Sequence, residues 1–393
     1  MADRALMEKT TITDLSVEFL PSLNAIDASE WDGLADDDYP FLRHHFLWGL
    51  EKTGCTNAES GWQPCHAVLR RGQQAIAIMP LYLKSHSYGE YVFDWAWADA
   101  WNRVGLDYYP KLVSAIPFTP ATGPRICMLP EEDHDTVYRA LLSGIAQLAK
   151  RQTISSFHLL FPNESVANRL VDESTHLRVG SQFHWFNEGF EDFEEFLTTF
   201  SSRKRKNLRR ERKRVAEQGL NLKTLVGDEI SAHDWEQFHH FYQLTYAKRS
   251  GHGGYLNKEF FTQTAAGMGE QVIMVRASLG DRAVAAALYF RSNDTLFGRY
   301  WGAEYEYDCL HFEACYYQGI EFCIANGLKR FDPGAQGEHK IQRGFRPIKT
   351  YSNHWIADAR LSAAVGDFTR QEQVQIENYI SQAKQLLPFK TSE

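Results

Sequence analysis

The segment 299–355 gathers the side chains that could carry out acid–base chemistry. It reads RYWGAEYEYDCLHFEACYYQGIEFCIANGLKRFDPGAQGEHKIQRGFRPIKTYSNHW and combines Glu, His, Tyr, Lys and Arg with several glycines. Glycine lets a backbone approach a ligand closely, and sites form outside the carboxyl ends of parallel strands. The pattern predicts a strand ending at Gly302, a helix over 310–327 and a parallel strand leading into the loop 332–344. A solvent-exposed loop beside a salt-bridged helix start is the competing interpretation.

Several enzyme classes are excluded because their motifs are missing. The sequence contains no GxSxG elbow, no GxxxxGK[ST] loop, no HExxH and no GxGxxG after a strand. His311 and Glu313 form the HxE of zinc deaminases, but the PCxxC that completes that site is absent. We therefore expect no metal site.

Charge is concentrated in one segment. The net charge is −8, yet residues 203–214 (RKRKNLRRERKR) hold nine Lys/Arg and one Glu. We expect a helix from Ser202 to Glu217 that packs through Leu208 and Val215. Its basic side chains then point outward and bind an anionic partner, or they form an ordinary solvated face; the outward residues are Arg203, Lys206, Arg210 and Lys213.

Composition sets the broad class of the protein. Hydrophobic residues make up 44% and charged residues 23% of the 393 residues, which is ordinary for a globular protein. No run approaches the roughly 18–20 apolar residues that cross a bilayer. The first residues lack the apolar core of a secretory signal, and the six cysteines form no CxxC pair. These features predict a cytoplasmic protein with reduced thiols and no membrane span.

The order of expected elements repeats along the chain. Hairpin strands over 66–85, a helix over 133–151 and a strand over 155–161 are followed, in the second half, by strands within 271–304, the helix 310–327 and a strand near 329–334. Residues 72–85 also match 280–292 in sequence. We therefore predict a duplicated α/β unit with mixed sheets, divided into domains 1–195 and 196–393, the second carrying the probable active site.

The chain resembles the FemAB-like N-acyltransferases of the peptidoglycan biosynthesis or recognition group, within the GNAT superfamily. The resemblance lies in residues 97–125, 182–197, 201–212, 299–302, 310–318 and 334–347. It implies two tandem GNAT-like units and transfer of an acyl group to an amine. One segment departs from the family: Arg249-Ser-Gly-His-Gly253 stands where an aromatic residue is usual.

Acyl transfer requires a neutral amine, a general base and donors for the oxyanion. The catalytic candidates are His311, Glu313, Tyr316 and His339. Which of His311, Glu313 and His339 is the base stays open, and Tyr316 could protonate the leaving group. The resemblance implies an oxyanion donor on the backbone of the strand ending at Tyr300–Gly302. The substrate-binding candidates are Tyr300, Trp301, Asp332 and Glu338, and we interpret Cys315 as a packing residue.

The functional hypotheses differ in the identity of the acyl donor. We expect no permanently bound cofactor and a thioester co-substrate, acyl-CoA or an acyl carrier protein, with a peptide or small-molecule amine as acceptor. The donor-binding candidates are Arg203, Lys206, Gly334, Gly337, Lys340 and Arg343. Aminoacyl-tRNA, used by Fem ligases, is the alternative, although no heptads predict the coiled-coil arm that those ligases often carry. A non-catalytic binding module with the same fold is a further alternative.

Overall fold

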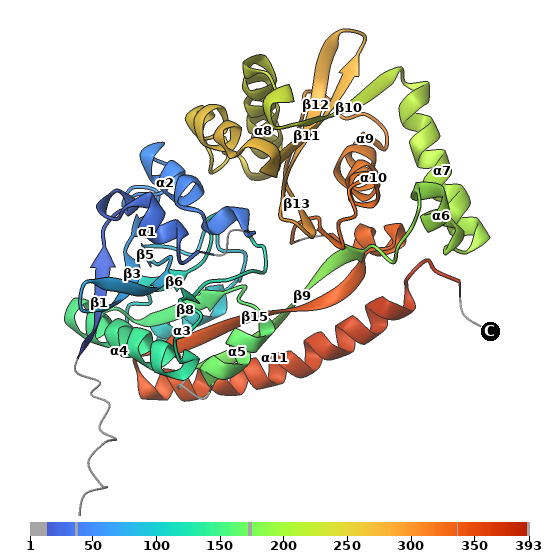
Figure 1. Ribbon diagram of the computed structural model, residues 1–393. Coiled ribbons are helices and arrows are strands. Elements are labelled where there is room, and N and C mark those ends of the chain that lie inside the picture. Colours follow the sequence, from blue (N-terminus) through green and yellow to red (C-terminus); the bar gives the residue numbers. More distant parts are fainter. Residues whose placement is uncertain (1–13, 36–37, 172–174, 336, 391–393) are drawn as a thin grey trace, which may run out of the picture.

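The computed structural model describes residues 14–35, 38–171, 175–335 and 337–390. Figure 1 shows the two halves of the chain joined by long central strands, with the C-terminal helix running along both of them. None of the helices within these ranges is long and apolar enough to cross a membrane.

The elements of the first half follow the predicted order of hairpin strands, helix and strand. The strands are β1 (Leu15–Leu20), β2 (Trp62–Pro64), β3 (His66–Arg71), β4 (Gln74–Met79), β5 (Tyr82–Lys84), β6 (Lys111–Ser114), β7 (Cys127–Met128), β8 (Ser156–Leu160) and β9 (His176–Phe186). The helices are α1 (Ala28–Asp32), α2 (His44–Lys52), α3 (Trp95–Arg103), α4 (His134–Gln152), α5 (Glu164–Val171) and α6 (Phe193–Thr198).

The second half begins with the predicted basic helix. The strands are β10 (Leu220–Val226), β11 (Val272–Leu279), β12 (Arg282–Arg291), β13 (Thr295–Ala303), β14 (Arg330–Asp332) and β15 (Arg346–Ile356). The helices are α7 (Ser202–Glu217), α8 (Ala232–Ser250), α9 (Leu310–Phe312), α10 (Gln318–Ala325) and α11 (Ala359–Gln385). A π-helical turn, Glu313–Tyr317, joins α9 to α10, and a 3₁₀ turn, Glu338–Arg343, precedes β15.

The large sheet has the same strand pattern on both sides of its centre. Its order is β10-β11-β12-β13-β14-β9-β15-β8-β6-β5-β2. In the second half, β13 is antiparallel to β12 and parallel to β14, which is antiparallel to β9. In the first half, β6 is antiparallel to β5 and parallel to β8, which is antiparallel to β15. The predicted duplication of a mixed α/β unit is therefore visible in the pairing.

Each half gives its last strand to the other half. Strand β9 pairs with β14, β15 pairs with β8, and the two exchanged strands pair with each other over nine residue positions from Arg346–His184 to His354–His176. Helix α11 then packs on β9 and β15. This exchange makes one continuous sheet from two units. The boundary between domains 1–195 and 196–393 stays a prediction, since the chain crosses between the units both before and after it.

Helix α7 has the predicted length and packing face. Leu208 and Val215 are buried at 3% and 2% exposure, while Arg203, Lys206 and Arg210 are exposed. A charged helix can still fold onto the domain through so narrow an apolar stripe because tertiary packing, not helix propensity, supplies most of its stability.

Candidate active site

A cavity opens where two parallel strands separate. Strands β13 and β14 pair only from Thr295–Arg330 to Phe297–Asp332, although β13 continues to Ala303. The cavity beyond this point has a volume of about 720 Å³, a size typical of small-molecule sites. It is lined by residues 298–301 of β13 and residues 333–335 after β14. This is the fork at the carboxyl ends of parallel strands that the sequence predicts as the site.

A β-bulge shapes the strand at this fork. Leu288 pairs with Tyr300 and Tyr289 pairs with Gly298, so Arg299 is the extra residue of β13. The Arg299 guanidinium donates to the Asp332 carboxylate at 2.7 Å, and both side chains are buried. Bulges recur next to active sites because they redirect side chains. Here the bulge places an internally neutralised ion pair beside the cavity.

Asp332, predicted as a substrate-binding residue, is already occupied by this ion pair. It also accepts a hydrogen bond from the Gly334 N–H at 2.9 Å, and it does not line the cavity. Burial is the largest influence on the pKa of Asp332 and would raise it, but the charge of Arg299, with smaller effects of His184, the Gly334 N–H and Lys340, lowers that pKa overall. The carboxylate therefore holds the fork together.

Three of the predicted catalytic residues do line the cavity. His311, Tyr316 and His339 come from α9, the π-helical turn and the 3₁₀ turn. The Tyr316 Oη lies 2.8 Å from His339 Nε2, and the His311 and His339 rings are 6.2 Å apart. Burial lowers the pKa of His311 to about 3 and that of His339 to about 4, and it raises the pKa of Tyr316. Both imidazoles are therefore neutral at pH 7, while the phenol keeps its proton.

Lys340 is the second titratable group on the same turn. Its side chain is buried, lines the cavity, and donates from Nζ to the Gly334 carbonyl oxygen at 2.6 Å. Burial lowers the pKa of Lys340 to about 7. Gly337 permits this tight turn: its φ is 114°, and a Cβ there would lie 2.3 Å from the His339 ring. A lysine with a pKa of about 7 can give up or take up a proton near neutral pH.

Glu313 does not line the cavity. Its carboxylate accepts hydrogen bonds from Arg212 of α7 at 2.9 and 3.1 Å and from Gln318 at 2.8 Å. With its oxygens so occupied, Glu313 is poorly placed to accept a proton from a substrate, contrary to the sequence-based hypothesis. The π-helical turn explains the difference, since it changes the phase of the side chains along this helix.

Arg343 and Glu338 also bind other parts of the protein. The Arg343 guanidinium donates to Glu211 at 2.9 and 3.0 Å and lies 3.4 Å from the centre of the Phe312 ring. Glu338 accepts from the Tyr379 hydroxyl at 2.8 Å. Neither lines the cavity, and Arg203 and Lys206 lie outside it on α7. The remaining predicted residues, Tyr300, Trp301, Gly334 and Gly337, do line it.

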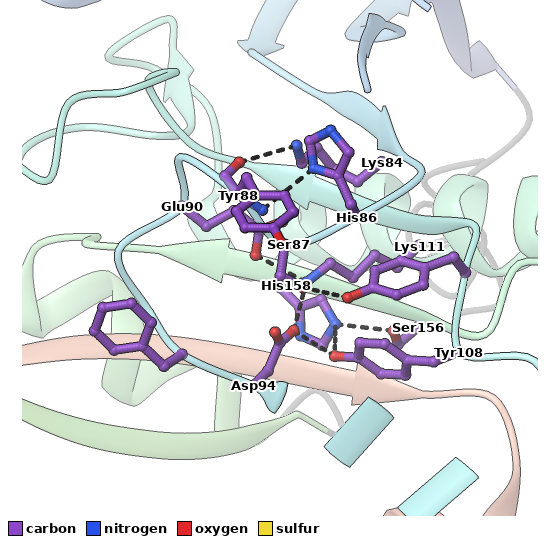
Figure 2. A network of polar contacts seen from close by, with 12 residues as sticks. Lys84, His86, Ser87, Tyr88, Glu90, Asp94, Tyr108, Lys111, Ser156 and His158 are labelled. Atoms are coloured by element: carbon purple, nitrogen blue, oxygen red, sulfur yellow. Dashed lines mark hydrogen bonds and ion pairs between the residues drawn. The ribbon is translucent and has the colours of Figure 1, made fainter. Parts of the chain in front are cut away.

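The segment 85–95 forms a wall of the cavity that the sequence analysis did not identify. It contributes Ser87, Tyr88, Tyr91, Phe93 and Trp95 from the first half of the chain. Figure 2 shows how this segment is held: Lys111 of β6 points into it and forms ion pairs with Glu90, at 2.8 Å, and with Asp94. No sequence motif identifies this wall, because its position beside the cavity depends on how the two halves of the chain pack together.

Arg249 contributes a charge from another wall. It lies in the last turn of α8 and lines the cavity. Helix α8 reaches this position because β13 has Gly302 at the contact, where a Cβ would lie 2.2 Å from the Phe241 backbone. Arg249 belongs to the segment that departs from the family pattern, which was the one signal for it in the sequence.

The corresponding strands of the first half have a buried arginine at the end of β8. Strands β6 and β8 pair from Leu112–Phe157 to Ser114–Leu159. Arg125, at 1% exposure, donates to the carbonyl oxygens of Leu160 and Ala121 at 2.9 and 2.6 Å. The cavity of about 720 Å³ lies at the fork of the second unit. Within the described ranges, no group of three or more His, Cys, Asp or Glu is arranged to hold a metal ion.

The FemAB-like family model, described as peptidoglycan biosynthesis/recognition, matches residues 22–391. The chain belongs to the FemAB-like family. No curated protein matches its sequence. The solved structure of FemX is similar to this protein, with a TM-score of 0.52 and 11% sequence identity. The similarity covers 87% of this chain and 98% of the FemX chain.

Two further solved structures are similar. The C-terminal DUF2156 domain of an Agrobacterium fabrum protein has a TM-score of 0.53 and 9% identity over 88% of this chain and 96% of its own. A tandem GNAT protein of the clavulanic acid biosynthesis pathway has a TM-score of 0.45 and 10% identity, covering 88% and 99%. At such identities the likeness concerns the fold, which in this FemAB-like protein is a mixed α/β arrangement of two similar units. Family membership makes the protein a transferase.

Proposed function

We propose that this protein transfers an acyl group from a thioester donor to an amine, in the cavity between β13 and β14. The observation that carries the proposal is that three side chains line the same fork. They are the buried Lys340, whose pKa is about 7, and the hydrogen-bonded pair Tyr316 and His339. The amine nitrogen attacks the thioester carbonyl carbon, the C–S bond breaks and the thiol leaves. The amine proton passes to the enzyme, and a proton is returned to the leaving sulfur.

Lys340 is the proposed general base. An ideal base has a pKa near the operating pH, and burial gives Lys340 that property. A neutral lysine amine can donate one N–H to the Gly334 carbonyl oxygen and still present its lone pair to the cavity. The Gly334 contact therefore orients the base.

Tyr316 is the proposed donor to the leaving group. Its hydroxyl keeps its proton at neutral pH, and after that proton passes to the leaving group the neutral His339 beside it can relay a replacement proton to the phenolate through its two ring nitrogens. The backbone of β13 at Tyr300–Gly302 remains the proposed oxyanion donor. No Ser or Cys nucleophile is needed. Burial raises the pKa of Cys315 far above its usual range, so that thiol stays protonated.

The loop between β13 and α9 favours a carrier-bound thioester over acyl-CoA. Phosphates bind at glycine-rich loops that open a helix, whereas residues 304–308 read Glu-Tyr-Glu-Tyr-Asp and contain no glycine. Two of these carboxylates form ion pairs, Glu304 with Arg282 and Asp308 with Arg214. The phosphates of CoA would meet carboxylates at this helix start, while an acyl carrier protein keeps most of its charge outside the fork.

Aminoacyl-tRNA is the second candidate donor. The exposed cations of α7 favour it, because they could bind a phosphate backbone outside the cavity while an ester enters the fork. The chemistry at Lys340 and Tyr316 would be the same, with an alcohol in place of a thiol as leaving group.

The test is product formation from defined donors. The purified protein is incubated with acetyl-CoA, an acyl carrier protein loaded with acetate, or alanyl-tRNA, each with amino acids, amino sugars and short peptides, and acylated products are detected by mass spectrometry. Lys340→Met should abolish the product, whereas Tyr305→Phe, an exposed tyrosine outside the cavity lining, should not. The proposal fails if no donor yields an acylated amine, or if Lys340→Met is as fast as the wild type.

A further inference from the structure

The charged groups in the cavity wall are all basic. Arg249, Arg299 and Lys340 line it, and none of the described lining residues is Asp or Glu. Arg299 is neutralised by Asp332 at 2.7 Å. Lys340 has its hydrogen bond to Gly334 and, in the proposed function, is the base. Arg249 therefore remains as the cation available to a ligand.

The position of Arg249 suits ligand binding. Its side chain is exposed, and no ion pair with a described residue is found for it. Burial is the main cause of the low pKa values of His311 and His339, and the positive charge of Arg249 lowers both further. The guanidinium thus acts on the space in which the reaction would occur.

The surroundings of Arg249 define the rest of the ligand. Tyr246, one turn earlier on α8, and Tyr255 after the helix also line the cavity, with ring centroids 6.0 Å apart. Their rings offer apolar faces, and their hydroxyls offer hydrogen bonds. A ligand here would carry an anionic group beside a small apolar portion.

We propose that Arg249 binds a carboxylate of the acceptor, so that the acceptor is an α-amino acid or a peptide carrying a carboxylate close to its reacting amine. The inference rests on the proposed function and names its substrate class. Guanidinium and carboxylate match in planar, two-pronged hydrogen bonding, and the guanidinium is always charged. The same charge disfavours a protonated amine nearby, which suits an acceptor that must lose a proton before it attacks.

The experiment measures binding of product-like probes by calorimetry, without a donor. N-acetyl-L-alanine carries the carboxylate, N-acetyl-L-alaninamide is its neutral isostere, and phosphoethanolamine tests a phosphate in its place. The wild type should bind the carboxylate at least about ten-fold more tightly than the amide. Arg249→Gln should remove that preference, and Arg249→Lys should keep part of it. Lys248→Gln is the matched control, because Lys248 is the exposed neighbour outside the cavity lining.

Equal binding of the acid and the amide by the wild type, an unchanged preference in Arg249→Gln, or no binding of either probe would overturn the assignment. Tighter, Arg249-dependent binding of phosphoethanolamine would overturn it in favour of a phosphate. Turnover separates the two proposals. A carboxylate preference without product from any donor defeats the proposed reaction alone. Acylation of alanine and alaninamide at equal kcat/KM, unaffected by Arg249→Gln, defeats the carboxylate site alone.

Discussion

The Tyr316 hydroxyl oxygen lies 2.8 Å from Nε2 of His339, although the two residues stand on different elements of the second unit. Tyr316 belongs to the π-helical turn Glu313–Tyr317, and His339 belongs to the 3₁₀ turn Glu338–Arg343. π-Helical turns occur frequently at functional sites. Here the turn directs Tyr316 toward the cavity and Glu313 toward α7.

Replacing Tyr316 with Phe should lower kcat strongly and leave the fold intact. The ring is buried at 4% exposure and its packing is retained, so only the hydroxyl is lost. Positioned acid–base groups contribute about 10²–10⁴-fold, and we expect a loss in that range. The measurement is single-turnover acyl transfer by rapid quench. If Tyr316→Phe and His339→Gln each lower the rate and the double variant is no slower, the two residues act as one unit; full activity in Tyr316→Phe contradicts its role.

The pH dependence of turnover should report Lys340. The folded pKa of about 7 lies below the ordinary value of 10.5, so the neutral, active form increases as pH rises through about 7. We expect kcat at saturating acceptor to rise between about pH 6 and 8 and then level off. Lys340→Met should remove the rise together with most of the activity. Retention of the rising limb in this variant would assign it to another group.

The same shift has a consequence for stability. Between pH 7 and 10.5 the unfolded chain binds a proton at Lys340 that the folded chain does not bind. The free energy of unfolding should therefore gain a contribution that grows with pH across that window. Urea unfolding of the wild type and of Lys340→Met at pH 7 and 9 measures it, and the wild type should gain more than the variant.

Glu313→Gln should cost stability more than activity. The buried carboxylate loses its charge-assisted hydrogen bonds to Arg212, while Arg212 keeps Glu321 as a partner at 2.6 Å. We expect the free energy of unfolding to fall by about 1–3 kcal/mol and kcat to change by less than about ten-fold. Glu306→Gln, at an exposed site, is the control. A hundred-fold loss of turnover with unchanged stability would restore Glu313 as the base.

Much of the second unit could be predicted from local sequence. Apolar runs of strand length joined at Gly280-Asp281 and Asn293-Asp294 predicted the hairpins of β11, β12 and β13. The narrow apolar stripe of Leu208 and Val215 predicted α7. Both signals are read within one element or between neighbouring ones, so the sequence contains them directly.

The exchanged strands and the direction of Glu313 could not be predicted in this way. A strand pattern does not identify its neighbours in a sheet, and both β9 (176–186), which the sequence analysis did not predict, and β15 (346–356) join the opposite unit. Regular helical spacing places Glu313 near the strand ends, whereas the π-helical turn rotates it toward Arg212. Arg249 and the wall 85–95 reach the cavity only through packing of distant segments.

Removing the buried cation of the first unit should loosen the cavity wall 85–95. Lys111 is fully buried and pairs with Glu90 and Asp94, which are also buried. Lys111→Met leaves two buried carboxylates without their ion-pair partner, a change that costs about 3–5 kcal/mol for a buried pair. Thermal unfolding should shift downward, and proteolysis should cut first within 85–95. Lys150→Met, at an exposed helix position, should change neither; an unchanged melting temperature in Lys111→Met would contradict this account.

The exposed face of α7 should bind an anionic partner in a salt-dependent way. The structure gives several cations of this helix partners within the protein: Arg209 pairs with Glu194, Arg212 with Glu313 and Glu321, and Arg214 with Asp308. Arg203, Lys206 and Arg210 have no ion pair with a described residue, and they are exposed. Like charges spaced three or four residues apart repel one another by a few tenths of a kcal/mol, and a carrier protein or tRNA would offset this cost.

We expect Arg203→Glu/Lys206→Glu/Arg210→Glu to weaken binding of that macromolecule at low salt. The effect should fade at high salt, where the Debye length is about 3 Å at 1 M. Charge reversal at Lys223, Lys248 and Lys390, outside this face, is the control for net charge. Fluorescence anisotropy with labelled carrier protein and labelled tRNA distinguishes the two donors. Equal binding of the wild type and the triple variant at low salt would show that this face is only a solvated surface.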